Sequence, residues 1–265
     1  MTDKKPPVVA ICMPIYDHPK IQFWRSYNQL WKPYGSSPHF PGGATYPIDQ
    51  HGWMIDDARN ALTDDALRMH ESYPGNPEVT HLLFIDADMQ FPPHALKQLL
   101  AHDLPIVGGL CHNRRAPYNP ILARLHQSER GLEEGVMGFL YHFPQDGLVE
   151  VDATGGAFLL VERRVFEEIA VKHGPISWWS RIDRASEDFS FCRRARECGF
   201  KIHVDVGLDI GHVAELIVDR EFAKKNRPFE VNAWDSQRSV AKGKPVASVV
   251  IPTYNQKPRY LRAAI

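Results

Sequence analysis

The stretch THLLFIDAD at Thr80–Asp88 decides the fold of this chain. Its apolar part predicts a buried β-strand over Thr80–Ile85. Residues two apart in an extended segment point the same way, so Asp86 and Asp88 are expected to face one crevice at the end of that strand. Two converging carboxylates repel each other, and a divalent cation between them removes the conflict. The alternative for this pair is a strand-end Asp followed by a helix-capping Asp.

Segments on both sides of this strand alternate between apolar runs and helical periodicity, which predicts an α/β fold with a mostly parallel sheet. The ligand site of such a sheet lies at the carboxyl ends of its strands. The other predicted strands are Val8–Pro14, Pro105–Leu110, Val149–Asp152, Ala157–Val161, Lys201–Val206 and Leu208–His212. The predicted helices are Pro19–Trp31, Asp56–Glu71, Pro92–Leu100, Arg163–Lys172 and a helix capped by Ser186 that runs to Cys198. Residues 33–50 are expected to form a long loop.

The bulk composition is that of an ordinary globular protein. Of 265 residues, 43% are hydrophobic and 24% are charged, and the formal net charge is −1. This charge excludes a global basic field for nucleic acid or membranes. The four cysteines form no CxxC pair and are expected to be free thiols in a reducing cytosol. The first residues contain no secretory or membrane-spanning segment, so a cytoplasmic location is expected.

Two further sites carry residues that suit catalysis. His212 follows an apolar strand and is expected at the same sheet edge as the carboxylates, where a mixed His and Asp set suits Mn²⁺ better than Mg²⁺. A purely structural His is the alternative. Glu187 and Asp188 begin a helix, where acids complement the helix dipole. A carboxylate in this place can also deprotonate an acceptor hydroxyl.

Small and aromatic residues suggest contacts with a cofactor or sugar. Gly155 and Gly156 lie between strands and permit either a close ligand approach or a tight turn. One of the adjacent Trp178 and Trp179 is expected to line a sugar platform, with Trp179 as the choice, or else to pack under a loop. Arg59, near a helix start, is expected either to contact a phosphate or base of the cofactor or to lie on a solvated face.

The two ends of the sequence resemble each other. VASVVIP at Val246–Pro252 echoes VVAICMP at Val8–Pro14, and each is followed by a polar, tyrosine-containing turn. We therefore expect one domain over residues 1–225, a linker over 226–245 and the truncated start of a second domain over 246–265. The alternative is a C-terminal strand that joins the first sheet.

Taken together, these segments resemble the GT-A glycosyltransferases, above all glycosyltransferase family 2. The resemblance covers most of residues 8–212 and follows the order of the family motifs. Its segments are VVAICMPIYD at 8–17, ARN at 58–60, FIDAD at 84–88, TGGAFLLVERRVFE at 154–167, SEDFSFCRRARECGFKI at 186–202 and IGH at 210–212.

The resemblance implies a role for each matching residue. Pro14 and Tyr16 would bind the nucleotide base, Asp86 would hold the ribose or the metal, and Asp88 and His212 would bind the metal. The implied cofactors are Mn²⁺ or Mg²⁺ and a nucleoside diphosphate sugar, with a UDP-sugar favoured.

The matches around the helix start imply the rest of the reaction. Asp188, paired with Glu187, would be the catalytic base of an inverting transfer, and Gly155 and Gly156 would adjoin donor sugar and acceptor. If Asp188 only caps the helix, a retaining mechanism stays open. The sequence departs from the family in its long aromatic segment at 33–55 and in lacking the QxxRW motif of processive synthases, so processive synthesis is not expected.

The predicted partner of the donor is a hydroxyl acceptor, either a glycan or a small molecule. A modified DNA base is the second choice, since Arg114-Arg115 and Arg193-Arg194-Ala195-Arg196 are basic clusters, although solvated faces explain them equally well. A nucleotidyltransferase-like enzyme is a rival, but the Gly-rich basic loop that it needs is not found near the first strand. A catalytically inactive nucleotide- or glycan-binding module is the rival outside enzymes.

Overall fold

The computed structural model describes residues 6–30, 44–72, 78–125, 137–215 and 222. The elements below all belong to the unit Met1–Glu215. The predicted linker over 226–245 and the predicted second domain from 246 lie outside the described residues.

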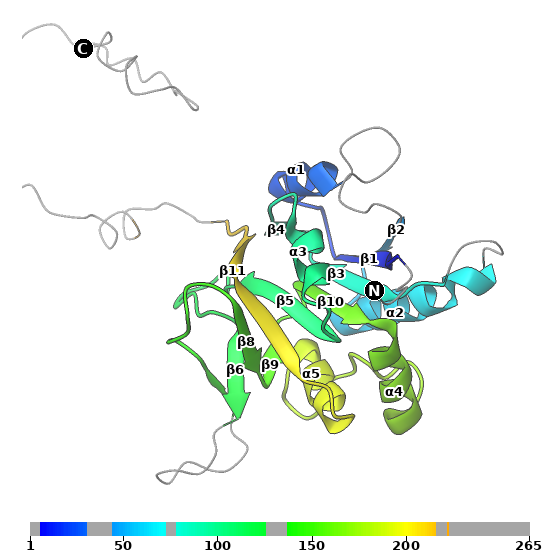
Figure 1. Ribbon diagram of the computed structural model, residues 1–265. Helices are drawn as coiled ribbons and strands as arrows, with labels where there is room; N and C mark the ends of the chain where they lie inside the picture. Colours follow the sequence, from blue (N-terminus) through cyan, green and yellow to red (C-terminus); the bar gives the residue numbers. More distant parts are fainter. Residues whose placement is uncertain (1–5, 31–43, 73–77, 126–136, 216–221, 223–265) are drawn as a thin grey trace, which may run out of the picture. The chain divides into compact units, whose positions relative to one another are not determined.

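An eight-stranded sheet forms the centre of this unit, in the order β2-β1-β3-β10-β5-β11-β4 with β8 also paired to β11 (Figure 1). Five strands run in one direction: β1 (Val8–Ile15), β2 (Ala44–His51), β3 (His81–Ile85), β5 (Ile106–Cys111) and β11 (Ile202–His212). Three run against them: β4 (Met89–Gln90), β8 (Leu148–Val151) and β10 (Phe158–Glu162). The predicted α/β fold with a mostly parallel sheet is confirmed.

A smaller antiparallel sheet lies beside the large one in the same unit. It pairs β7 (Met137–Phe139), β6 (Leu122–Leu125) and β9 (Ala153–Thr154) in that order.

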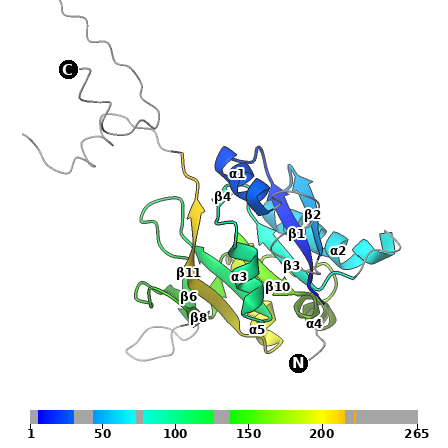
Figure 2. The same ribbon diagram turned by 45° about the horizontal axis from the view of Figure 1, so that its top comes forward.

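The helices cover both faces of the large sheet (Figures 1 and 2). They are α1 (Ile21–Leu30), α2 (Ile55–Ser72), α3 (Ala95–Ala101), α4 (Arg163–His173) and α5 (Glu187–Glu197), so each predicted helix is present. The apolar sides of α1 and α3 pack on one face, and those of α2, α4 and α5 pack on the other. Among the described residues, no helix has both the length and the apolar character that a membrane crossing requires.

The strand β1 shows why the sheet is buried on both sides. Ala10 and Cys12 belong to the hydrophobic cluster under α2, α4 and α5, whereas Val9, Ile11 and Met13 belong to the cluster under α1 and α3. Successive side chains of a strand point to opposite faces, so a strand covered on both faces needs an uninterrupted apolar run. The free thiols expected from the sequence are present, with Cys12 among the three that are buried.

Strand β2 corrects the expectation of a loop up to Gln50. Its sequence, ATYPIDQH, is mostly polar and contains Pro47, which cannot donate a backbone hydrogen bond. A proline is tolerated in this strand because, among the described strands, β2 pairs with β1 alone and lies at the edge of the sheet. The polar composition therefore reflects an edge position and not a loop.

Ser186 corrects a second expectation, that its side chain caps α5. Its backbone has the extended conformation of an N-cap residue, but its hydroxyl makes no capping bond to the helix. The hydroxyl instead donates a hydrogen bond to the carboxylate of Asp188.

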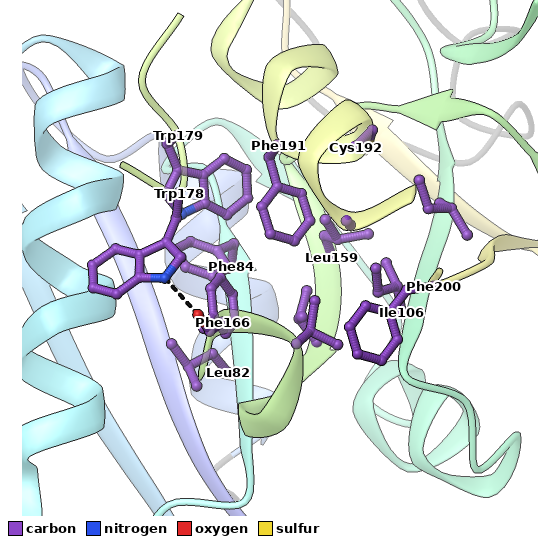
Figure 3. Packing of buried hydrophobic residues seen from close by; sticks show 14 of the residues in the cluster. Leu82, Phe84, Ile106, Leu159, Phe166, Trp178, Trp179, Phe191, Cys192 and Phe200 are labelled. Atoms are coloured by element: carbon purple, nitrogen blue, oxygen red, sulfur yellow. Dashed lines mark hydrogen bonds between the residues drawn. The ribbon is translucent and has the colours of Figure 1, made fainter. Parts of the chain in front are cut away.

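The two adjacent tryptophans correct a third expectation, because both are buried (Figure 3). Trp179 is fully covered and stacks on Phe191 with ring centroids 4.4 Å apart. Trp178 donates from Nε1 to the carbonyl oxygen of Phe166 at 2.8 Å. Since Trp179 Nε1 also has a buried partner, Thr63 Oγ1 at 3.0 Å, both polar ends are satisfied inside the core. The prediction that Trp179 lines a sugar platform is wrong.

Candidate active site

The carboxyl ends of β1, β3, β5 and β11 meet at one edge of the sheet, because these strands are parallel. A cavity of about 430 Å³ opens at this edge. Its lining includes Pro14, Tyr16, Asp86, Asp88, Arg114 and His212. The structure therefore brings five of the eleven predicted site residues to this cavity, namely Pro14, Tyr16, Asp86, Asp88 and His212, whereas Glu187 and Asp188 are not among its lining residues.

An irregularity in β11 adjusts where His212 lies. The register between β11 and β5 shifts between Asp205 and Asp209. The backbone N–H of Gly207, inside this irregular segment, donates to Asp205 Oδ1 at 3.0 Å. A Cβ at Gly109 would lie 2.5 Å from the side chain of Ile210, so the close packing of β5 on this part of β11 requires glycine. Bulges of this kind change the direction of a strand and therefore the position of the residues that follow, here His212.

His212 and Asp88 form the polar centre of the cavity. His212 Nε2 lies 3.2 Å from Asp88 Oδ2, and His212 Nδ1 lies 2.9 Å from the carbonyl oxygen of His112. The carbonyl can only accept, so Nδ1 carries a proton, and Nε2 donates to the carboxylate of Asp88 when the ring is protonated. The hydrogen bond to Asp88 raises the pKa of His212 above its ordinary value, against the opposing effect of burial. Burial alone raises the pKa of Asp88, but His212 and Arg114 outweigh it and the net pKa is lowered.

Arg59 links the end of β3 to the start of α5. Its guanidinium donates to Asp86 Oδ1 at 2.8 Å and to Glu187 Oε1 at 2.5 Å, and it lies over the ring of Trp179, 5.2 Å from the centroid. Arg59 is 2% exposed, so its side chain neither lies on a solvated face nor is accessible to a cofactor. The prediction that Arg59 binds the cofactor is wrong. Its position connects two carboxylate motifs that are far apart in the sequence.

The charges around Arg59 act on one another strongly. Burial lowers the pKa of Arg59, but the carboxylates of Asp86 and Glu187 outweigh this and hold its pKa above the ordinary value. Burial raises the pKa of Glu187, and the charge of Arg59 offsets this only in part. The guanidinium therefore stays charged and favours the ionised form of Glu187, which opposes part of the effect of burial on the pKa of that carboxyl.

Asp188 lies one residue beyond Glu187 and is partly exposed. Its Oδ1 accepts from the Ser186 hydroxyl and from the backbone N–H of Phe189, the latter at 2.8 Å. Both of these bonds fall on one oxygen, so Oδ2 is the oxygen suited to take a proton from an acceptor. A Cβ at Gly155 would lie 3.7 Å from this Oδ2, which places the glycine beside the carboxylate.

Gly156 has a structural reason to be glycine. A Cβ at this position would lie 2.9 Å from Cζ of Arg59, closer than van der Waals contact allows. The pair of glycines is buried. A contact of Gly155 or Gly156 with the donor stays a prediction.

An apolar hollow adjoins the polar cavity and shares Pro14, Tyr16 and Ile55 with it. Its volume is about 290 Å³, and Trp53 and Met54 complete much of its wall. Tyr16 is 76% exposed and Trp53 is 50% exposed, so both rings are accessible at the hollow. The sequence predicted Tyr16 here but not Trp53 or Met54, although the aromatic character of residues 33–55 was a signal.

The side chains at the cavity fit a divalent cation in part. Within the described ranges, no three His, Cys, Asp or Glu side chains gather as a preformed metal group. Asp88 and His212 supply one oxygen and one nitrogen in contact, whereas Asp86 is held by Arg59. An ion that takes its remaining ligands from phosphate oxygens and water needs few protein ligands, and a mixed nitrogen and oxygen set suits Mn²⁺. The role of Asp86 as a metal ligand stays a prediction.

Comparisons with known proteins support the fold. The sequence matches no model of a protein family and has no significant match among curated proteins. The structure of GalNAc-T7 with UDP, GalNAc and Mn²⁺ aligns with 80% of this chain at a TM-score of 0.50 and 12% identity. The fold is GT-A-like. This chain covers 44% of the GalNAc-T7 chain, so it spans less than half the length of that neighbour. The structure of A197 from STIV aligns with 79% of this chain and 86% of its own, at a TM-score of 0.48 and 14% identity.

Proposed function

We propose that this chain is a metal-dependent glycosyltransferase that moves a sugar from a nucleoside diphosphate sugar to a hydroxyl acceptor. The contact of Asp88 with His212 carries this proposal, because these residues are 124 positions apart and meet at the ligand-binding edge of the sheet. A GT-A-like neighbour was crystallised with UDP, GalNAc and Mn²⁺, which supports the same ligand class.

The cavity and the hollow suggest how the donor is held. Asp88 Oδ2 and His212 Nε2 would bind the cation, which when bound neutralises the diphosphate that leaves. The exposed rings of Tyr16 and Trp53 would hold the nucleotide base, since aromatic faces stack on bases. A UDP-sugar is the favoured donor.

Asp188 is the proposed catalytic base. The acceptor hydroxyl attacks the anomeric carbon from the face opposite the diphosphate, and its proton passes to Asp188 Oδ2. A new glycosidic bond forms as the bond to the diphosphate breaks, so the configuration inverts. Glu187 is not suited to this step because it is buried and paired with Arg59. We therefore assign Asp188, and not Glu187, as the residue that touches the acceptor.

The basic cluster on α5 does not favour a DNA acceptor. Arg194, in the middle of the cluster on α5, is buried and donates to the carbonyl oxygen of Ser180 at 2.6 Å. A side chain committed to the protein's own backbone cannot contact phosphates of DNA. A glycan or small hydroxyl compound is the proposed acceptor class.

A screen of nucleotide sugars for Mn²⁺-dependent hydrolysis tests the proposal. Water can replace the acceptor in such an assay, so the screen needs no knowledge of the natural acceptor. We expect at least one donor to be hydrolysed with Mn²⁺ and to be spared when a chelator is present. The proposal fails if no nucleotide sugar in the screen is hydrolysed in a Mn²⁺-dependent manner.

A further inference from the structure

Arg114 makes a contact that the proposed reaction does not yet use. It follows β5 in a turn that is closed by a bond from the backbone N–H of Asn113 to the carbonyl oxygen of Asn119, at 2.9 Å. Its Nη1 donates to Asp88 Oδ2 at 2.8 Å. His212 Nε2 lies 3.2 Å from the same oxygen. The oxygen expected to bind a cation is therefore already held by a guanidinium.

This arrangement sets the guanidinium in competition with a divalent ion. A metal–carboxylate bond is about 2.0–2.2 Å long, so an ion on Asp88 Oδ2 would lie within contact distance of Arg114 in its present position. Like charges at that distance repel strongly where water is partly excluded. Since Asp88 is only 18% exposed, the guanidinium and the ion cannot share the oxygen without cost.

The side chain of Arg114 has room to move away from Asp88. It is 53% exposed, and it borders a second cavity of about 220 Å³ as well as the first. Lys20 also borders both cavities. The planar fork of a guanidinium matches the oxygens of a phosphate, to which it donates two parallel hydrogen bonds.

We propose that Arg114 is the counter-cation of Asp88 in the metal-free protein, and that the arriving divalent ion displaces its guanidinium onto the diphosphate of the donor. This inference rests on the proposed function. Arg114 is then a residue with two opposite effects: it weakens the binding of the metal alone and strengthens the binding of the diphosphate once the metal is present. A purely structural role for Arg114 would weaken both.

The test uses Arg114→Gln, with Arg115→Gln as the matched control that removes the same charge one residue along the turn. Free Mn²⁺ is measured by electron paramagnetic resonance as the protein is titrated with the metal alone. We expect Arg114→Gln to bind Mn²⁺ about threefold or more tightly than the wild type, which corresponds to the loss of a partly exposed ion pair. Arg115→Gln should change this affinity less.

The second measurement is calorimetric titration of UDP in saturating Mn²⁺. Arg114→Gln should bind UDP about tenfold more weakly, as expected for the loss of one charge-assisted hydrogen bond. Arg114→Lys, which keeps the charge but not the fork, should fall between the wild type and Arg114→Gln in both measurements.

The outcomes separate this inference from the proposed function. If Arg114→Gln leaves the affinity for Mn²⁺ unchanged or weakens it, while the wild type binds Mn²⁺ and UDP together, only the role of Arg114 is overturned. The same holds if Arg114→Gln leaves the affinity for UDP unchanged. If the wild type shows no Mn²⁺-dependent binding of UDP, the proposed function is overturned and the inference falls with it.

Discussion

Replacement of Arg59 by Met should strongly destabilise the protein. The guanidinium is 2% exposed and makes ion pairs with Asp86 and Glu187. Methionine keeps much of the apolar stem but leaves both carboxylates without their cation. The side chain of Glu187 is 10% exposed and that of Asp86 is 24% exposed, so Glu187 carries the larger penalty.

The expected loss is about 3–5 kcal/mol in the free energy of unfolding, the usual cost of removing one partner of a buried ion pair. The double variant Arg59→Met/Glu187→Gln removes the carboxylate that the single change leaves unpaired. It should therefore recover about 1 kcal/mol or more relative to Arg59→Met alone, because contacting partners do not act additively. Equilibrium unfolding in urea measures both values.

The loss should also depend on pH. Burial raises the pKa of Glu187 in the folded protein, and removal of Arg59 takes away the charge that holds this pKa down. The unfolded pKa of a glutamate is about 4.3. If the pKa in the folded protein is higher, the contribution of this carboxyl group to the free energy of unfolding is fully present below the unfolded pKa. That contribution is lost as the pH rises through the folded pKa. The difference in free energy of unfolding between wild type and Arg59→Met should therefore be smaller near pH 4.5 than near pH 7.5. A loss below about 1 kcal/mol, or a double variant no more stable than Arg59→Met, would refute the reasoning.

Three further predictions concern Gly156, Asp205 and Asp188. Gly156→Ala should cost about 1–3 kcal/mol in urea unfolding, because its Cβ would lie 2.9 Å from Cζ of Arg59, and a cost near zero would show that the guanidinium moves freely. Burial alone raises the pKa of Asp205, but hydrogen bonds from His102 and Gln98 outweigh it and the net pKa is lowered. Asp205→Asn should therefore lose stability relative to wild type above about pH 4, and this difference should shrink as the pH falls through the folded pKa; a pH-independent difference contradicts this. Asp188→Asn should lower sugar transfer by about 10²–10⁴-fold with donor binding kept, and near-normal transfer would remove Asp188 as the base.

The strand ends of the site were predictable from the sequence, whereas its buried charges were not. Asp88 and His212 each follow an apolar run, and parallel strands bring such positions to one edge whatever their separation in the chain. The sequence predicts a surface or ligand position for Arg59, because its partners Asp86 and Glu187 are 27 and 128 positions away. No local pattern shows that a charged residue near a helix start will find two carboxylates inside the protein.

The sequence did not predict correctly which aromatic side chains are exposed: Trp179 was expected at the site and is buried, and Trp53 was not expected there and is exposed. Trp179 is buried because Thr63, a helix residue 116 positions away, accepts its N–H, and the sequence around Trp179 does not reveal that partner. Trp53 is exposed at the hollow because the edge strand β2, which the sequence did not predict, ends just before it. Aromatic composition therefore located the region of a site but did not say which rings face it.

The central claim is that Asp88 and His212 together bind a divalent ion that holds a nucleoside diphosphate. Calorimetric titration of UDP with and without Mn²⁺ tests it on the wild type, Asp88→Ala and His212→Ala, with the exposed His142→Ala as control. We expect Mn²⁺ to tighten UDP binding to the wild type and the control by about tenfold or more, and to have little effect on the other two variants. Equal UDP affinity with and without Mn²⁺ in the wild type, or a full Mn²⁺ effect in His212→Ala, would contradict the claim.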